Sequence, residues 1–354
     1  MTNPDAEAAQ PCPACGERKY RVLFQETDRL YRTTTRPFEV IECGGCRLIR
    51  LHPWPSSAEL RTYYPDDYWF APSPGAAERL EELYRRVVLR DHLRFVRTAI
   101  RNAGGSGLLL DVGCGGGLFL GMLAQSAQAA RPGSHRRSNS ADLAAPRESV
   151  VRESPRSGVR IAGLDFSWNA ARIAWAQKGA PAVCADLAMA PFAAQSCSVI
   201  TMFHVVEHLY DPAAYLTAAH RLLQPDGRLV VQVPNASSWQ FHVFGKRWSG
   251  IDVPRHLIDF RQRDLDRLLG DCGFEPVRYK HFSLRDNPAG LATTLAPSLD
   301  PMARRIRRTG ESSGARLLKD LVYMALVMAS VPFTALEAAF GAGSTIMVEA
   351  RKKR

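Results

Sequence analysis

Several features that would restrict the protein's class are missing from this sequence. It has no run of 18 apolar residues, so we do not expect a membrane-spanning helix. Its first residues have neither a basic start nor an apolar stretch, so we expect no signal peptide and a cytoplasmic protein. Reduced thiols are then the norm, and the eight cysteines do not indicate a disulfide framework. With 46% apolar and 23% charged residues, a wholly disordered chain is excluded.

The net charge of +11 is unevenly distributed. Three short segments carry the excess, at 126–160, 301–320 and 351–354, and the remainder is close to neutral. Such a distribution favours solvated loops and a basic tail over a continuous basic groove. We therefore do not expect nucleic acid to be the partner.

Composition and hydrophobic pattern divide the 354 residues into five segments. The pattern predicts a disordered tail at 1–10, a cysteine module at 11–50, an irregular linker at 51–75, an α/β domain at 76–285 and a C-terminal segment at 286–354. The residues 126–158 within the α/β domain are rich in Ser, Arg, Pro and Ala, which predicts a disordered insertion.

Strand-like and helix-like segments alternate between about 107 and 280. Apolar runs at 108–112, 160–165, 199–203, 229–233 and 274–279 predict strands, with helical patterns between them. This alternation is typical of an α/β fold in which a doubly wound, mostly parallel sheet carries helices on both faces.

A glycine-rich loop follows the first of these strands, in the sequence Asp111-Val-Gly-Cys-Gly-Gly-Gly117. Glycines at such a junction allow a ligand to approach the backbone. A dinucleotide site would place its third glycine at 118, where this chain has Leu118. The carboxylate of Asp111 suits a ligand with a cationic group better than a pyrophosphate, so a nicotinamide oxidoreductase is disfavoured.

In these residues the chain resembles the class I S-adenosylmethionine-dependent methyltransferases, whose Rossmann-like sheet has seven mostly parallel strands. The resemblance covers about 76–285 and the final strand. It implies that Asp165 accepts the ribose hydroxyls, that Asp186 lies near the adenine, and that Phe203 and His204 line the methionine part. The full set of cofactor residues implied is Asp111, Gly113, Cys114, Gly115, Gly117, Asp165, Phe166, Asp186, Leu187, Phe203 and His204.

The acceptor is expected at the carboxyl ends of the strands. The stretch Trp248-Ser-Gly-Ile-Asp-Val-Pro-Arg-His256 is similar to one found in a branch of this superfamily that acts on small molecules. We predict His256 as the general base and Arg255 as the group that orients a small-molecule acceptor, either a sugar, a quinone-like compound or a lipid-linked scaffold. The alternatives are that His256 only bonds the backbone of its loop and that Arg255 only pairs with Asp252. Glu207 and His208 are further catalytic candidates. They could hold a divalent ion, as in some quinone-biosynthesis relatives, or Glu207 could simply suit a helix start.

Two Cys-x-x-Cys pairs, Cys12/Cys15 and Cys43/Cys46, lie beside strand-like stretches. Four thiolates suit a structural zinc ion in a zinc ribbon, with a redox dithiol as the alternative. We expect the ribbon to pack against the α/β domain through residues 63–69.

The C-terminal segment contains four arginines between 304 and 308, followed by an uncharged stretch from Leu321 to Leu336. Because Pro332 interrupts this stretch, we expect a buried pair of helices before a last strand at 345–349. The alternative is a peripheral membrane contact through 304–340. For the whole chain, the alternative function is a zinc-ribbon nucleic-acid-binding or RNA-modifying protein.

Overall fold

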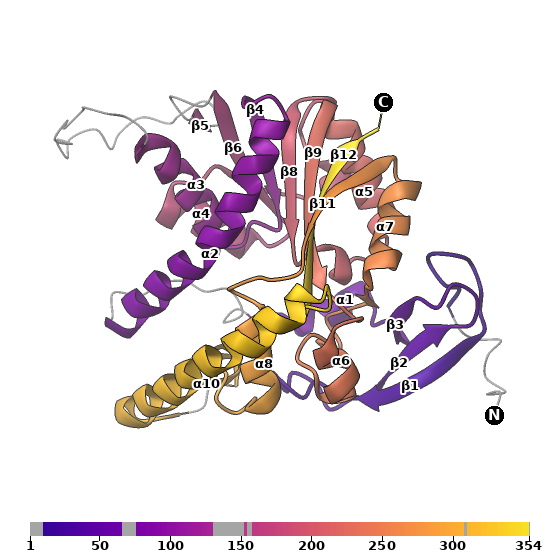
Figure 1. Cartoon of the computed structure of the whole chain (residues 1–354), viewed down its shortest axis with the longest axis vertical. Coiled ribbons are helices and arrows are strands. Elements are labelled where there is room, and N and C mark those ends of the chain that lie inside the picture. The colour runs from indigo at the N-terminus through magenta and orange to yellow at the C-terminus, as the bar shows by residue number, and fades with distance from the viewer. Residues whose placement is uncertain (1–9, 66–75, 130–151, 154–157, 308–309, 354) are drawn as a thin grey trace.

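The computed structural model describes residues 10–65, 76–129, 152–153, 158–307 and 310–353. Residues 1–9 of the predicted tail, residues 66–75 of the predicted linker and most of the insertion predicted at 126–158 lie outside these ranges. Figure 1 shows a large central sheet flanked by helices, with a smaller sheet at the N-terminal end of the chain.

The central sheet has the strand order β11-β12-β9-β8-β4-β6, with β5 and β7 both paired to β6. Without the two-residue β5 it has the seven strands predicted. Its members are β4 (Gly107–Val112), β5 (Arg152–Glu153), β6 (Val159–Asp165), β7 (Ala182–Cys184), β8 (Cys197–Phe203), β9 (Leu223–Pro234), β11 (Phe274–Lys280) and β12 (Thr345–Lys352).

Six strands of this sheet run in the same direction. β4 pairs in parallel with β6 and β8, β8 with β9, and β6 with β7, and β11 shares their direction because it and β9 both pair antiparallel with β12. The last strand, β12, lies antiparallel between β9 and β11. The carboxyl ends of the parallel strands therefore meet at one edge, where the predicted cofactor residues follow β4, β6, β7 and β8.

Helices cover both faces because successive side chains of a strand point in opposite directions. On one face Leu109 and Val199 pack against α2 (Ala76–Asn102) and α3 (Leu118–Ala129). On the other face Leu108 and Ile200 belong to the core that includes α5 (Pro212–Leu222) and α7 (Gln262–Asp271). The predicted layered α/β fold is confirmed.

The N-terminal sheet has the order β1-β2-β3-β10. Its strands β1 (Tyr20–Glu26), β2 (Phe38–Cys43) and β3 (Ile49–His52) come from the cysteine module, whereas β10 (Ile258–Asp259) comes from the segment after β9. Apolar residues of both parts, such as Val40 and Leu257, lie in one continuous core. The module is therefore built onto the α/β domain, and Tyr63 is buried in the shared core, whereas residues 66–69 of the predicted bridge lie outside the described residues.

The remaining helices are α1 (Ser57–Thr62), α4 (Trp168–Lys178), α6 (Trp239–Phe244), α8 (Asn287–Leu295), α9 (Pro301–Ile306) and α10 (Ser313–Ala339), with the short 3₁₀ turns η3 (Leu187–Met189), η4 (Val206–His208) and η5 (Gly245–Arg247). Two boundaries differ from the sequence prediction. Helix α3 continues to Ala129, into the segment predicted as an insertion from 126, and β9 begins at Leu223, before the strand predicted at 229–233.

The prediction of a buried helix pair near the C-terminus was wrong. Helix α10 is one uninterrupted helix of 27 residues with Pro332 inside it. By length and composition alone it could cross a membrane, and only 28% of its most apolar window is buried. Pro332 lacks the N–H that would bond the carbonyl of Met328, but its fixed φ is compatible with a helix, and the helix continues through it.

Candidate functional site

The glycine loop between β4 and α3 adopts a conformation that requires glycine. Gly113 and Gly117 both have φ of +73°, in the left-handed region. A Cβ on Gly113 would lie 2.5 Å from Val205 Cγ2, and one on Gly117 would lie 2.7 Å from Ala174 Cβ. The loop therefore places bare backbone at the carboxyl end of β4, with Gly113 exposed and Gly115 half-buried.

Asp165, at the end of β6, is attached to this loop. Its Oδ2 accepts the Gly115 N–H at 2.9 Å and its Oδ1 accepts the Ser167 N–H at 2.9 Å. The side chain is buried, and burial raises its pKa in spite of these two bonds. Each carboxylate oxygen keeps a second lone pair for a ligand hydroxyl.

Asp111 is buried beneath the loop, where it accepts a 2.6 Å hydrogen bond from Thr201 Oγ1. Burial, helped by the charge of Asp165, raises the pKa of Asp111 to about 7. Two carboxyl groups thus lie close together under exposed backbone, an arrangement that favours a ligand with a positive charge.

The other predicted cofactor residues lie at the same edge of the sheet. Phe166 is exposed and its ring contacts Tyr64. Asp186 is exposed, caps η3 by accepting the Ala188 N–H, and also accepts a bond from the Tyr215 hydroxyl. Leu187 and Cys114 are buried, so they can support the site only from beneath.

At the end of β8, the ring of Phe203 lies between Phe119 of α3 and His92 of α2. His204 follows with φ of +55° and bonds Glu207 Oε1 through Nδ1 at 3.1 Å. Its Nε2 lies 3.6 Å from Asp286 Oδ1. Burial alone would lower the pKa of His204, but the two carboxylates outweigh it and raise this pKa to about 9.

The sequence analysis missed two polar residues that lie near His204, namely Asp286 and Gln232. Asp286 lies just beyond β11 and accepts a 2.6 Å bond from Gln232 of β9. Gln232 is buried within an apolar strand, which is itself a signal that a polar partner is near. No pattern in the sequence connects the two, because they are 54 residues apart and meet only through sheet order.

The role predicted for Arg255, to orient the acceptor, is contradicted. Its guanidinium is fully buried and forms ion pairs with Asp28 at 2.9 Å and Asp252 at 2.7 Å. It also stacks over the ring of Tyr31, 4.4 Å from the centroid. Since Asp28 and Tyr31 belong to the cysteine module, Arg255 connects that module to the α/β domain and has no free donor face for a substrate.

His256 and His208 lie next to each other, with ring centroids 4.7 Å apart. His256 is almost completely buried, and burial lowers its pKa to about 4. Such a histidine is a weak base, so its predicted role as general base stays a prediction that this environment does not favour. Glu207 is also buried. Its carboxylate lies close to the rings of His208 and His256 and bonds His204 through Oε1.

The sequence of the chain matches known proteins over the region that holds this site. Residues 78–279 match the family model described as a methyltransferase domain. The chain is 29% identical over 210 residues to a ubiquinone biosynthesis O-methyltransferase of Cereibacter sphaeroides, covering 57% of this chain and 74% of that protein. It is 30% identical over 122 residues to a probable S-adenosylmethionine-dependent methyltransferase of Mycolicibacterium smegmatis, covering 33% and 44%.

The chain belongs to this methyltransferase family. It is a class I S-adenosylmethionine-dependent methyltransferase, in agreement with its strand order. Among solved structures, a SAM-dependent methyltransferase from Archaeoglobus fulgidus aligns with 78% of this chain and all of that one, at 16% identity and a TM-score of 0.44.

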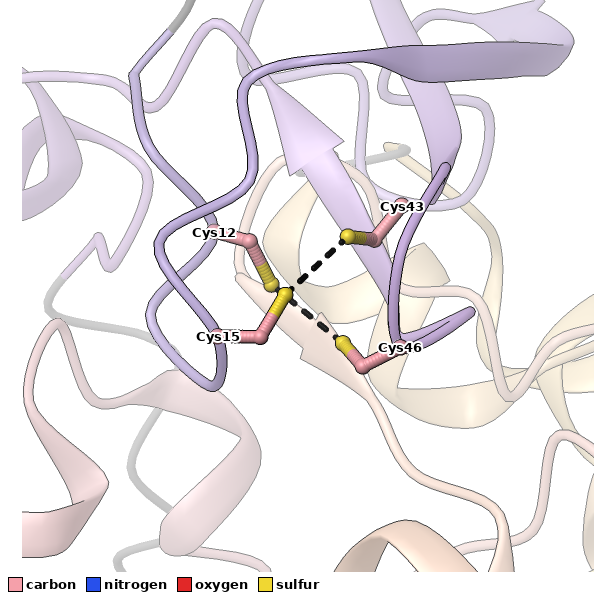
Figure 2. Close-up of side chains that lie close together, drawn as sticks. All are labelled: Cys12, Cys15, Cys43 and Cys46. Atoms are coloured by element: carbon pink, nitrogen blue, oxygen red, sulfur yellow. Dashed lines mark hydrogen bonds between the residues drawn. The ribbon is translucent and has the colours of Figure 1, made fainter.

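The family match begins after the four cysteines, so the cysteine module is additional to the methyltransferase domain. In Figure 2 the four side chains point toward one another from two loops. The sulfurs of Cys12 and Cys46 are 3.6 Å apart, as are those of Cys15 and Cys43, and all four lie within 4.8 Å. Sulfurs around a tetrahedral zinc ion with Zn–S bonds of ~2.3 Å are ~3.8 Å apart, so the donors fit such an ion.

The surroundings of Arg50 also fit a metal ion bound by the four cysteines. It is buried, and its Nε and Nη1 have no hydrogen-bond partner within the described residues. Burial lowers the pKa of Arg50, whereas the charges of Cys12 and Cys43 raise it. A buried cation without full hydrogen bonding is unfavourable unless negative charge lies close by. Four thiolates around one divalent ion carry a net charge of −2 and would provide it.

Proposed function

We propose that this methyltransferase transfers the methyl group of S-adenosylmethionine to a small-molecule acceptor. The observation that carries the proposal is the bare glycine loop joined to Asp165 and lying over Asp111. The curated relatives add support, since several are named ubiquinone biosynthesis O-methyltransferases. Their names give methylation on oxygen in ubiquinone biosynthesis, so a quinone-like compound is one acceptor class that we propose.

The residues of the chain have separable tasks in this function. The cofactor supplies a methyl group on a positively charged sulfur. The loop N–H groups and Asp165 would hold its ribose and amino-acid ends, and Asp186 and Phe166 would flank its base. The acceptor oxygen would then have to lie in line with the sulfur–methyl bond, so positioning would provide most of the rate enhancement.

Calorimetry with S-adenosylhomocysteine tests the cofactor part. We expect Asp165→Ala to weaken binding by at least 10-fold, since a buried charged hydrogen bond contributes about 1.5–3 kcal/mol. Asp271→Ala, on the exposed side of α7, is the matched control and should bind as the wild type does. Equal affinity in both variants would contradict the assignment. Transfer of radiolabelled methyl groups to fractions of a metabolite extract would then identify the acceptor class.

We also propose that Cys12, Cys15, Cys43 and Cys46 bind a structural zinc ion. Four thiolates leave no open coordination position, so this ion would stabilise the module and take no part in the reaction. Purified wild-type protein should contain zinc that the Cys12→Ser variant lacks, and Cys184→Ser, an exposed cysteine outside the cluster, should retain it. Zinc content unchanged by Cys12→Ser would refute this site.

For α10 we propose contact with a lipid surface by an otherwise cytoplasmic protein. From Leu321 to Leu336 the helix has no charged residue, and many of its apolar side chains are exposed. Arg316 at its start is exposed, and Lys319 is 40% exposed although it pairs with Glu311 at 2.8 Å, so we place both cations at the end of the helix that meets anionic head groups. The intact protein should float with vesicles that contain anionic lipid, and failure to float would remove this proposal.

A second candidate function is methylation or binding of RNA. It is favoured by a hollow of about 380 Å³ between α2 and α3, lined by Arg86, Arg90, Arg94 and Arg97. Methyl transfer to RNA, abolished by Arg90→Ser with Arg94→Ser, would establish this function in place of a small-molecule one.

A further inference from the structure

Arg304 and Arg307, both at the C-terminal end of α9, have different surroundings. Arg304 is buried and pairs with Glu311 at 2.9 Å and with Asp320, so its charge is compensated within the fold. Arg307 forms no salt bridge within the described residues. Its Nη2 donates to backbone carbonyl oxygens of the cysteine module, one of them that of Arg29 at 2.9 Å. The module therefore fixes Arg307 in place without bringing a carboxylate to it.

Arg307 belongs to a group of four neighbouring arginines, the arginine row, whose other members are Arg29, Arg32 and Arg247. Arg29 Nη2 donates to the carbonyl oxygen of Arg247 in η5, just as Arg307 donates to that of Arg29. Burial lowers the pKa of Arg307, and the nearby charge of Arg32 lowers it further, although two carboxylates oppose this. Like charges thus lie side by side from η5 to the end of α9.

Part of the arginine row is built into the surface. Arg29 and Arg307 are half-buried, and Arg307 Nε is buried without a hydrogen-bond partner among the described residues. Burial lowers the pKa of Arg29, and the charge of Arg247 lowers it further, against that of Glu26. Guanidinium groups held by backbone carbonyls are well placed to donate to an anion, and phosphate oxygens suit their forked geometry. An anion at this place would offset the mutual repulsion.

Helix α6, which precedes η5, adds an exposed apolar contact beside these cations. Its Val243 is 70% exposed, and Trp239 at its start lies against Phe333 and Phe340 of α10, with ring centroids 6.3 and 5.4 Å apart. Figure 1 shows α6 next to the C-terminal end of α10. The two exposed basic residues of η5 follow α6 directly. Exposed apolar side chains bordered by Lys and Arg are typical of a surface that lies on lipid.

We propose that the arginine row binds the phosphate head group of an anionic lipid while α6 and α10 contact the acyl region. This rests on the lipid contact proposed for α10, to which it adds a second helix and a site for the head group. The row connects both helices, because Arg247 follows α6 and Arg307 precedes α10. The cysteine module supplies Arg29 and Arg32, so the head group ties the module to the lipid surface as well.

Arg32→Asn combined with Arg247→Ser is the informative variant. Both side chains are exposed, and asparagine tolerates the left-handed φ of +58° at position 32. Arg263→Ser combined with Arg267→Ser is the matched control, because it removes the same charge from α7, where the two side chains are 64% and 56% exposed. Arg247→Ser alone is the second variant, which leaves the backbone at position 32 untouched.

The measurement is flotation of the full chain with vesicles of phosphatidylcholine, either alone or mixed with phosphatidylglycerol. A cation near an anionic surface contributes about 1 kcal/mol, so affinity for the mixed vesicles should fall about 30-fold in the double variant and about 5-fold in Arg247→Ser. The α7 control should bind as the wild type does. Vesicles in which oleate supplies the same surface charge should bind the wild type more weakly, because they offer no phosphate.

Helix α6 is tested on the same vesicles. Val243→Glu should weaken binding, because a charged side chain is costly in the acyl region. Val277→Glu of β11, where the valine is 46% exposed, is the control and should bind normally. Equal binding by the two variants would remove α6 from the proposed surface. Circular dichroism equal to that of the wild type shows that each variant is folded.

The outcomes separate this inference from the lipid contact of α10. A wild type that floats with neither kind of vesicle contradicts both. A wild type that floats with phosphatidylglycerol as well as its double arginine variant does leaves the α10 contact standing and refutes the head-group site. An equal loss in the α7 control shows that net charge alone is responsible, and equal binding to oleate vesicles shows that phosphate is not recognised. Tight binding of inorganic phosphate in calorimetry, without a preference for phosphatidylglycerol, assigns the row to a soluble ion and also overturns the proposal.

Discussion

Helices α2 and α10 each contain 27 residues, yet they use their surfaces in opposite ways. Helix α2 buries its apolar face against the central sheet, and its arginines lie on the solvent side, where they line the hollow beside α3. Helix α10 buries only a narrow stripe and leaves most of its apolar side chains exposed. In Figure 1 it projects from the body of the molecule, with α8 packed alongside it.

The difference shows that helix length and apolar content do not decide where a helix packs. Helix α2 is amphipathic, with Leu89, Leu93 and Val96 on one side, so one face suffices to bury them. The buried stripe of α10 is partly polar, as Ser330, Thr334 and Glu337 show. Its apolar side chains therefore lie mainly on the faces that the rest of the chain leaves uncovered, which is unusual for a surface helix.

The largest difference in stability between the two helices should appear when one phenylalanine in each is replaced by alanine. Phe95 of α2 is buried and carries the guanidinium of Arg278 3.6 Å from its ring centroid, whereas Phe333 of α10 is 39% exposed. We expect Phe95→Ala to lower the free energy of unfolding by ~3–5 kcal/mol, and Phe333→Ala by less than ~1.5 kcal/mol. Urea unfolding measures both, and equal losses would contradict the contrast.

The buried titratable groups of the two helices should respond to pH in opposite directions. On α2, burial lowers the pKa of His92 to about 4, in spite of Asp286 and Asp91 and together with Arg285 and His204. On α10, burial raises the pKa of Glu337, against its bonds to Gln240. A lowered histidine pKa removes stability as pH falls, and a raised carboxyl pKa removes stability as pH rises.

The His92 effect is large enough to measure by urea unfolding at successive pH values. Between pH 6.5 and 4 the unfolded chain takes up a proton that folded His92 does not, which costs ~3 kcal/mol by pH 4. His92→Gln should remove that part of the acid slope. A slope identical to that of the wild type would show that His92 does not titrate on unfolding.

Pro332 allows a test within α10 alone. Pro332→Ala restores the N–H that can bond the carbonyl of Met328, so we expect the free energy of unfolding of α10 to rise by up to ~3 kcal/mol. Amide hydrogen exchange across 325–339 should slow accordingly. Unchanged exchange would indicate that neighbouring contacts already compensate for the missing bond.

Substitution of two equally exposed leucines should have the smallest effect on stability. It should also distinguish most clearly which of the two helices contacts a lipid surface. Leu321 of α10 and Leu83 of α2 are 58% and 57% exposed. Replacing either by Glu should change the free energy of unfolding by no more than ~0.5 kcal/mol. Only Leu321→Glu should abolish flotation with anionic vesicles. Loss of flotation in both variants, or in neither, would contradict the proposal that α10, in contrast to α2, contacts the lipid surface.

Local signals in the sequence were sufficient for much of the fold. The alternation of strands and helices predicts the layered sheet, and the run from Asp111 to Gly117 predicts the loop, because a bare backbone turn between strand and helix has few alternatives. The two Cys-x-x-Cys pairs could likewise be recognised from the sequence, since the two cysteines of each pair are close together along the chain.

Only the tertiary structure decided what depends on residues distant in sequence. Arg255 was taken for a substrate group because Asp28, its partner 227 residues away, cannot be inferred from spacing. His256 joins Glu207 and His208 only because β10 pairs with β3 and fixes the loop before it. Sequence patterns report the conformation of a segment, whereas burial and ionic partners are set by which segments the sheet order brings together.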